Sequence, residues 1–397
     1  MEKVRFGIIG VGNMGSSHAK TFLKGDVQNG VLTAICDLKQ EKLDKVLGLE
    51  YEGAKDIATF SDYKEMLKSG LCDVVIVAVP HYDHPQMTID VLNAGLNVIC
   101  EKPAGVYTKQ VKEMNEVAAK SDKIFAMMFN QRTNCVYRKM REMVQNGEIG
   151  EIKRVNWIIT TWYRSQSYYN SGGWRATWKG EGGGVLFNQC PHQLDLLQWV
   201  IGMMPKQIHS FCHFGKWHDI EVEDDVTAYL EYENGATGVF ITSTGDTPGT
   251  NRFEILGDKG KLVCEDVLVD GKKRDSLTFY KLDQSEREFN ATFTGGFGEP
   301  KCEAIKVETD GENPQHKGIL NNVANAVLGI EPLFVDGKEG INGVELMDAM
   351  LLSTWLGKSV ELPINDDLYL EELNKRIASG RSKEDVNVVL DTEGTYK

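Results

Sequence analysis

The sequence lacks any run of residues that is long and apolar enough to span a lipid bilayer. It opens Met-Glu-Lys-Val-Arg and passes directly into a short apolar segment, so no secretory leader is visible. Positive charge is scarce too, because 44 lysines and arginines face 58 aspartates and glutamates, for a formal charge of −14. This balance argues against nucleic acid or an anionic membrane as a partner. We therefore expect a cytoplasmic protein.

The eight cysteines lack the spacing of a metal site or a redox dithiol. No two of them form a Cys-x-x-Cys pair, which is the common signature of structural zinc and of thioredoxin-type chemistry. Cys36 and Cys100 instead lie within apolar runs, where a small thiol packs like any other core side chain. We expect buried, reduced cysteines and no bound metal.

The length of 397 residues exceeds what one ordinary core holds, and it predicts two domains. In the first third, short apolar runs alternate with helical segments. The predicted strands are Val4–Ile9, Leu32–Cys36, Asp73–Val79, Asn97–Cys100 and Phe125–Phe129, and the predicted helices are Gly15–Lys24, Leu38–Leu47, Pro85–Ala94 and Lys109–Ser121. This alternation is typical of a parallel sheet with helices on both faces. We expect a doubly wound α/β domain over residues 1–130.

The rhythm of the sequence changes after Asn130. A predicted helix over Cys135–Asn146 is followed by longer alternating runs, which are Lys153–Thr161, Asp225–Tyr232, Gly238–Ser243 and Arg252–Leu256. Neighbouring strands joined by short turns indicate a large open sheet that is mainly antiparallel. We place a second α/β domain over residues 131–397.

A glycine-rich turn follows the first predicted strand and opens the first predicted helix. It reads Gly10-Val11-Gly12-Asn13-Met14-Gly15 and fits G-x-G-x-x-G, in the strand-to-helix context that gives this motif its meaning. Gly10 allows a tight turn, Gly12 lets the backbone approach a pyrophosphate, and Gly15 lets helix and strand pack closely. We predict a dinucleotide site here, with a purely structural turn as the alternative.

Asp37 ends the second predicted strand, where a carboxylate can accept hydrogen bonds from the ribose of adenosine and repel a 2′-phosphate. This favours NAD over NADP. The alternative is an aspartate that only caps the helix expected near Leu38. Lys39 lies close by and would soften the discrimination against NADP.

The segment Glu101-Lys102-Pro103 directly follows another predicted strand. Ligands of open parallel sheets bind beyond the carboxyl ends of the strands. Lys102 is therefore placed to reach a substrate hydroxyl, although a surface salt bridge would explain a lysine here equally well.

The run Gly182–Asp195 carries the densest set of polar candidates. Pro191 suits the first turn of a helix that stops at Gly202, which puts His192 in that turn and Asp195 on the same face. The positive end of the helix dipole disfavours an imidazolium, so His192 is expected to be neutral and able to accept a proton. The alternative is a structural histidine.

Aromatic and arginine side chains are frequent in the segment before this run. Aromatic rings can pack on the apolar face of a pyranose, and arginine can bind its hydroxyls. Core packing explains most of them, and the better candidates are Trp174 and Arg175, followed by Arg164. His316 is a weaker candidate, because a histidine at the exposed start of a helix would look the same.

These motifs together resemble the Gfo/Idh/MocA family, named for glucose–fructose oxidoreductase, inositol dehydrogenase and a rhizopine-catabolism protein. The markers are GIIGVGNMGSSHA, AVPHYDH, EKPAG, FNQR, GEIGEI and GGGVLFNQCPHQLD, in this order along the chain. The resemblance implies a Rossmann domain, then an α/β domain whose open sheet often builds a homo-oligomer interface. It also implies NAD contacts from Gly10, Gly12, Asn13, Met14, Asp37, Val79, Pro80, His81, His84, Glu101, Lys102 and Asn130.

The chemistry that the resemblance implies is alcohol oxidation, with the nicotinamide near Lys102 and His192. His192 would take the hydroxyl proton, and Lys102 would polarise the hydroxyl and steady developing negative charge. Asp195 would bind a neighbouring hydroxyl or orient the histidine.

One position departs from the family pattern, because many members carry aspartate where this chain has Asn188. An amide cannot balance an imidazolium, so Asn188 is expected to bind substrate or orient a partner. The Asn-Gln-Cys-Pro-His form resembles members that act on levoglucosan or oxidise glycosides at the 3-hydroxyl. We predict an NAD-dependent oxidoreductase for a sugar, cyclitol or glycoside. The alternatives are a dihydrodiol- or biliverdin-type reductase, a redox-assisted glycosidase that recycles NAD, and a non-catalytic NAD-binding sensor.

Overall fold

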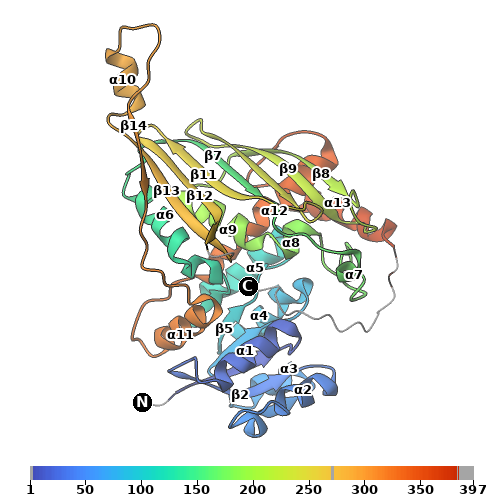
Figure 1. Cartoon of the computed structure of the whole chain (residues 1–397). Coiled ribbons are helices and arrows are strands. Elements are labelled where there is room, and N and C mark those ends of the chain that lie inside the picture. Colours follow the sequence, from blue (N-terminus) through green and yellow to red (C-terminus); the bar gives the residue numbers. More distant parts are fainter. Residues whose placement is uncertain (1–2, 270–271, 382, 384–397) are drawn as a thin grey trace. The chain divides into compact units, whose positions relative to one another are not determined.

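The computed structural model describes residues 3–269, 272–381 and 383, and its chain divides into two compact units (Figure 1). The first unit comprises Met1–Thr133 and Pro314–Val344, and the second comprises Asn134–Asn313 and Glu345–Lys397. A single boundary after Asn130 was predicted from the sequence, and the return of Pro314–Val344 to the first unit was not anticipated. No helix in the described part of the chain is long and apolar enough to cross a bilayer.

The first unit contains a six-stranded sheet in the order β3-β2-β1-β4-β5-β6. Its strands are β1 (Val4–Ile9), β2 (Gly30–Cys36), β3 (Ala58–Phe60), β4 (Val74–Val77), β5 (Asn97–Cys100) and β6 (Phe125–Met127). All neighbouring pairs are parallel. The strand order reverses between β1 and β4, which is the switch point where doubly wound sheets bind ligands. The predicted Rossmann sheet is confirmed.

The strands of this sheet are short apolar runs because helices cover both of their faces. All four residues of β4 are buried, with none of the alternation that a half-exposed strand would show. The connecting helices are α1 (Asn13–Leu23), α2 (Gln40–Leu47), α3 (Tyr63–Lys68), α4 (His84–Asn93) and α5 (Thr108–Lys120), with α11 (Gln315–Val327) added from the later segment. Asp62 starts α3 by accepting a hydrogen bond from the backbone N–H of Lys64 at 2.8 Å.

The second unit contains a nine-stranded sheet in the order β14-β13-β12-β11-β7-β10-β9-β8-β15. Its strands are β7 (Ile152–Ile159), β8 (Gln207–Phe214), β9 (Glu223–Glu231), β10 (Thr237–Ser243), β11 (Asn251–Gly257), β12 (Gly260–Val269), β13 (Lys272–Leu282), β14 (Cys302–Lys306) and β15 (Val360–Glu361). Among the described strand pairs of this sheet, β7 and β10 are parallel and the others antiparallel. The predicted large, mainly antiparallel sheet is confirmed.

Helices α6 and α9 lie along one face of this sheet (Figure 1). The helices of the second unit are α6 (Cys135–Gln145), α7 (Gln166–Tyr169), α8 (Val185–Asn188), α9 (Pro191–Ile201), α10 (Glu286–Thr292) and α13 (Asp366–Ser379), and the division between the units falls within α12 (Gly340–Leu356). Residues along the second half of β9 alternate between buried and exposed, as expected for a sheet covered on one face. Trp157 of β7 stacks on Phe253 of β11 at 4.2 Å in the core of this unit.

Candidate active site

The glycine turn of the first unit joins β1 to α1 as predicted. A side chain would have a different effect at each of its three glycines. Gly10 has φ +85°, and a Cβ there would lie 2.3 Å from the carbonyl oxygen of Ala78. A Cβ on Gly15 would lie 1.9 Å from the carbonyl oxygen of Gly10, so helix and strand are in close contact. A Cβ on Gly12 would meet nothing within 4 Å, which leaves this stretch of backbone open to a ligand.

The start of α1 offers the hydrogen-bond donors that a phosphate needs. No side chain caps the helix at Gly12, and its first turn holds no acidic residue. The first backbone N–H groups of a helix have no intrahelical partner and carry the positive end of the dipole. Asn13 and Met14 form this first turn. The turn therefore fits a pyrophosphate, because it offers free backbone N–H donors and leaves open space at Gly12.

Asp37 follows β2 and is bound to the same turn. Its Oδ2 accepts a hydrogen bond from the backbone N–H of Val11 at 3.0 Å, and its Oδ1 accepts from that of Lys39 at 3.0 Å. The ammonium of Lys42 lies 3.4 Å from Oδ2. Helix α2 starts at Gln40, so Asp37 precedes the helix and steadies both its approach and the glycine turn.

The ends of β4 and β5 are joined by a buried histidine. The ring nitrogens of His84 lie 2.7 Å from the carbonyl oxygen of Pro103 and 2.8 Å from that of Val79. Burial lowers the pKa of His84, although both carbonyls oppose this shift. His84 thus connects the turn after β4, which includes Pro80 and the buried His81, with the Glu101-Lys102-Pro103 turn after β5.

Glu101 is an internal anchor of the turn that carries Lys102. It is 4% exposed, its Oε1 accepts a hydrogen bond from His18 at 2.7 Å, and its Oε2 accepts one from the backbone N–H of Lys102 at 3.2 Å. Burial alone would raise the pKa of Glu101, but the hydrogen bond from His18 and the nearby positive charges lower it to about 2. The carboxylate therefore stays ionised inside the first unit.

His316 belongs to the same cluster of the first unit. Its ring lies edge-on to that of His18, with 5.6 Å between the ring centroids, and burial lowers its pKa to about 4. Asn130, also buried, donates its side-chain amide to the Oε1 of Gln315, which starts α11. The segment Pro314–Val344 thus contacts the rest of the first unit through the neighbouring residues Gln315 and His316. His316 is a half-buried part of this cluster and not an exposed helix start.

In the second unit, His192 differs from the other residues of α9 in its burial. The helix begins with Pro191 and ends at Gly202, whose φ is +71°, as the sequence predicted. Ten of its eleven residues are buried, and the remaining one is His192. Asp195 is 1% exposed, and its Oδ1 accepts a hydrogen bond from Gln198 at 3.2 Å. His192 is thus the side chain of α9 that reaches the surface of the helix.

Asn188 ends α8, between a carboxylate and a phenol. Its Nδ2 donates a hydrogen bond to Oε1 of Glu181, and its Oδ1 lies 3.3 Å from the hydroxyl of Tyr168, which donates to it. Glu181 is 1% exposed, and its Oε2 accepts the backbone N–H of Ala176 at 2.5 Å. The orientation of the Asn188 amide is therefore set by a buried negative charge.

The hydroxyl of Tyr168 is the centre of this polar network. It accepts hydrogen bonds from Nη1 of Arg175 at 2.6 Å and from Nε2 of Gln189 at 3.1 Å. The guanidinium of Arg175 lies over the rings of Tyr168, at 4.4 Å, and of Trp174, at 4.6 Å. Burial raises the pKa of Tyr168, so the phenol remains protonated and can donate to Asn188.

Arg164 also lies near the Tyr168 ring, with 5.2 Å between its guanidinium and the ring centroid. It also donates to the carbonyl oxygen of Tyr163 at 3.0 Å. The structure thus brings four of the predicted substrate residues around Tyr168, namely Arg164, Trp174, Arg175 and Asn188. Donors, acceptors and aromatic faces meet there, and such a group can bind a polar ligand by both hydrogen bonds and ring contacts.

A second buried glutamate supports this network from β9. Oε1 of Glu223 accepts the backbone N–H groups of Gly184 at 2.8 Å and Leu186 at 3.0 Å, at the start of α8. Its Oε2 is buried and has no hydrogen-bond partner within the described residues. Burial therefore raises the pKa of Glu223 to about 8, which leaves the side chain protonated at neutral pH.

Sequence reasoning missed several of these residues. Tyr168 was left among the aromatic residues that core packing explains, and neither His18 nor Glu181 was singled out. The available signal for Glu181 was a lone acidic residue inside the glycine run Gly180–Gly184, where small residues otherwise serve only close backbone approach.

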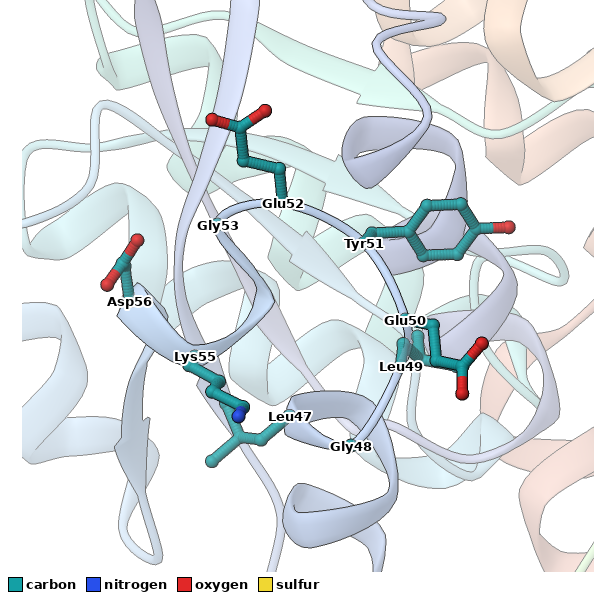
Figure 2. Close-up of a pocket in the computed structure, with 9 residues that line it drawn as sticks. All are labelled: Leu47, Gly48, Leu49, Glu50, Tyr51, Glu52, Gly53, Lys55 and Asp56. Atoms are coloured by element: carbon teal, nitrogen blue, oxygen red, sulfur yellow. The ribbon is translucent and has the colours of Figure 1, made fainter.

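A separate hollow of about 500 Å³ lies in the first unit, beside the loop between α2 and β3 (Figure 2). It is lined by Leu47, Gly48, Leu49, Glu50, Tyr51, Glu52, Gly53, Lys55 and Asp56. Figure 2 shows its three carboxylates pointing in different directions. None of the predicted site residues belongs to it, and its polar groups do not converge on a ligand.

Comparison with known proteins identifies the family. A profile described as an oxidoreductase family with an NAD-binding Rossmann fold matches residues 4–129, and one for the GFO/IDH/MocA C-terminal domain matches residues 137–263. A D-glucoside 3-dehydrogenase of Escherichia coli is 31% identical over 250 residues, which cover 58% of this chain and 68% of that protein. The chain belongs to the Gfo/Idh/MocA family. The resemblance predicted from its motifs is confirmed.

Further known proteins are similar to this chain in sequence or in fold. A myo-inositol 2-dehydrogenase of Thermotoga maritima is 25% identical over 274 residues, or 66% of this chain and 76% of that protein. The WlbA dehydrogenase of Chromobacterium violaceum, solved with NADH and UDP-GlcNAcA, is 26% identical with a TM-score of 0.75 over 92% of this chain and 97% of that one. A levoglucosan dehydrogenase solved with NADH and levoglucosan shares the fold, with a TM-score of 0.74 at 17% identity over 91% of this chain and all of that one.

Family membership confirms two further predictions, that the chain is an oxidoreductase and that its cofactor is NAD. The residues present fit this cofactor, because the glycine turn is open at Gly12 and the first N–H groups of α1 have no side-chain cap.

Proposed function

We propose that this protein is an NAD-dependent dehydrogenase of a sugar, cyclitol or glycoside, and that the alcohol it oxidises is the 3-hydroxyl. The observation that carries the proposal is the polar network around Tyr168, where arginine, amide and carboxylate groups meet two aromatic faces. Such a mixture of directed polar groups and ring faces suits a polyhydroxylated ring better than an apolar diol or a tetrapyrrole. The relatives named for inositol, glucoside and levoglucosan chemistry support the same class.

In this proposal, His192 is the acid–base residue. During oxidation its imidazole takes the proton of the substrate hydroxyl, and during reduction it returns that proton. The start of α9 favours the neutral imidazole that this role requires, because the helix dipole disfavours positive charge there. Bound NAD supplies the acceptor for the hydride that leaves the carbinol carbon.

Lys102 is the proposed electrophilic partner. Its ammonium donates to the reacting oxygen and stabilises the negative charge that develops as the O–H proton leaves. Its backbone N–H is held by Glu101, and the carbonyl of the following Pro103 contacts His84. These contacts fix the main chain on both sides of the lysine. Asp195 binds a neighbouring hydroxyl or orients His192, and Arg164, Trp174, Arg175 and Asn188 hold the rest of the ring.

The proposal extends to assembly and location, for which the family resemblance is the support. We propose a cytoplasmic homo-oligomer that forms through the open face of the nine-stranded sheet. Phe211 of β8 and Tyr229 of β9 are 59% and 44% exposed on adjacent strands of that sheet. Light scattering of the wild type against a Phe211→Glu variant tests this, since a monomeric wild type would contradict it.

The direct test of function is NADH formation from NAD⁺ and a substrate panel. The panel holds free sugars, inositols, levoglucosan, and O- and C-glycosides. We expect turnover of one polyol class, with product analysis placing the ketone at carbon 3. Absence of turnover across the panel while NADH still binds would refute the proposed activity, and a ketone at another carbon would refute the 3-hydroxyl assignment.

A further inference from the structure

The side-chain amides of Asn188 and Gln189, at the C-terminal end of α8, are aligned in one direction, and the alignment starts at Glu181. A carboxylate can only accept hydrogen bonds, so the amide group that faces Glu181 from Asn188 is Nδ2. The carbonyl oxygen of Asn188 therefore points the other way. There it accepts from Nε2 of Gln189 at 3.2 Å and from the hydroxyl of Tyr168 at 3.3 Å.

The amide of Gln189 is the end of this chain of hydrogen bonds. Its Nε2 is used twice, by Asn188 at 3.2 Å and by Tyr168 at 3.1 Å. Its Oε1 must then point away from both. Gln189 is 6% exposed, and no donor among the described residues reaches Oε1. A buried acceptor that the protein leaves unsatisfied is costly, and a ligand group that donates a hydrogen bond to it removes this cost.

We propose that Oε1 of Gln189 accepts a hydrogen bond from a substrate hydroxyl and that Glu181 is the positioning residue that turns this oxygen toward the substrate. The inference rests on the proposed function, of which it names a specificity determinant. A hydroxyl can donate to Oε1, whereas hydrogen, fluorine or a methyl ether at the same ring position cannot. The enzyme is therefore selective for a free hydroxyl at the ring position that faces Gln189.

Glu181 suits this task because each of its two oxygens accepts a hydrogen bond. Oε2 accepts from the backbone N–H of Ala176, at 2.5 Å, and Oε1 accepts from Nδ2 of Asn188, with the guanidinium of Arg175 3.7 Å from that same oxygen. A glutamine in its place has one acceptor oxygen, and the rigid backbone N–H would claim it. The NH₂ group of that glutamine would then face Asn188, whose amide would turn over to present its oxygen. Gln189 would follow, and its oxygen would no longer face the substrate.

The test combines three variants with altered substrates of the full-length protein. Wild type, Gln189→Met, Glu181→Gln and the double variant are assayed with NAD⁺, first on the polyol that the wild type turns over best and then on its mono-deoxy and mono-deoxyfluoro analogues. Gln193→Met is the matched control, because Gln193 is also 6% exposed and its Oε1 is likewise buried without a partner among the described residues, but Gln193 has no part in the hydrogen-bond chain from Glu181. NADH binding and thermal midpoints report on integrity.

We expect one deoxy position at which wild-type kcat/KM falls roughly 10-fold or more. On the parent substrate, kcat/KM of Gln189→Met should be lower than that of the wild type by about the same factor, mainly because KM rises. This variant should no longer distinguish the parent from that deoxy analogue. Glu181→Gln should behave in the same way, and the double variant should be no worse than either single one. Gln193→Met should keep the wild-type discrimination.

Two results would overturn the inference while leaving the proposed function intact. One is a Gln189→Met variant that still discriminates against every deoxy analogue as the wild type does. The other is an equal loss in Gln193→Met. A wild type that oxidises no polyol would instead refute the proposed function, and this inference with it. Additive losses in the double variant would remove Glu181 from its positioning role.

Discussion

Three buried glutamates show that the surroundings of a carboxyl group, more than its identity, decide its role. Glu101 receives hydrogen bonds from His18 and from the backbone of Lys102, and its pKa of about 2 keeps it ionised. Glu223 receives the backbone N–H groups of Gly184 and Leu186 on one oxygen, and burial raises its pKa to about 8. Glu181 lies beside Arg175, with 3.7 Å between charged atoms, and directs an amide. The role of each carboxyl group thus follows from its own balance of desolvation and hydrogen bonding.

At this scale, the proposed roles of His192 and Lys102 lead to a kinetic prediction. His192→Asn and Lys102→Met should each lower kcat by roughly 100-fold or more, because each removes a group that acts on the reacting oxygen. NADH affinity, measured by fluorescence titration, should change little. Wild-type turnover in either variant would remove that residue from the mechanism.

The contacts of Asp37 predict two separable effects of its removal. Asp37→Ala should narrow the ratio of kcat/KM for NAD to that for NADP, because the charge that repels a 2′-phosphate is lost. It should also cost about 1 kcal/mol of unfolding free energy, because two backbone N–H groups lose their acceptor. An unchanged cofactor ratio with lowered stability would show that Asp37 only steadies the turn.

At the scale of elements, short connections position the chemistry. Helix α1 is fixed against β1 by the glycine contact, and α8 is fixed to β9 by Glu223. The strand–helix alternation of the first unit was predictable because each buried parallel strand is a continuous apolar run. The three-residue strand β3 and the short helix α3 were not, because such short elements carry little periodicity.

Two glycine substitutions in one turn should separate folding from cofactor binding. Gly15→Ala places a Cβ 1.9 Å from the carbonyl oxygen of Gly10 and should lower both the thermal midpoint and NADH affinity. Gly12→Ala meets no protein atom within 4 Å, so it should keep the wild-type midpoint and still weaken NADH binding by roughly 10-fold or more. Tight NADH binding by Gly12→Ala would place the pyrophosphate elsewhere.

Glu223 predicts a pH-dependent stability that belongs to the α8–β9 connection. Its folded pKa of about 8 lies above the unfolded value, so the stability from its protonated form is complete below the unfolded pKa and is lost as pH rises through 8. The glutamine in Glu223→Gln cannot ionise. As pH rises from about 5 to 9, the thermal midpoint of this variant minus that of the wild type should therefore increase by on the order of 5 °C. Glu231→Gln, at a partly exposed residue of the same strand, is the control. Parallel midpoint curves for wild type and Glu223→Gln would contradict a raised pKa.

At the scale of the whole molecule, the sequence predicted the fold class, the family and the cofactor, because these depend on motifs that are local in the chain. Two features needed the folded structure. Residues 314–344 return to the first unit through contacts between Gln315 and Asn130, which are 185 residues apart. The network of Glu181, Asn188 and Tyr168 forms because the chain folds back and places the Asn188 amide between the carboxylate of Glu181 and the hydroxyl of Tyr168. Neither contact leaves a periodic signal in the sequence.

The proposal that hydride moves directly between a polyol carbon and NAD is tested most directly with an isotope. The wild type is incubated with NAD⁺ and its best polyol substrate, deuterated at the carbon that becomes the ketone. We expect NADH that carries the deuterium, formed more slowly than from the unlabelled substrate under conditions where chemistry limits the rate. Unlabelled NADH, or ketone formation without NADH, would contradict the proposed reaction.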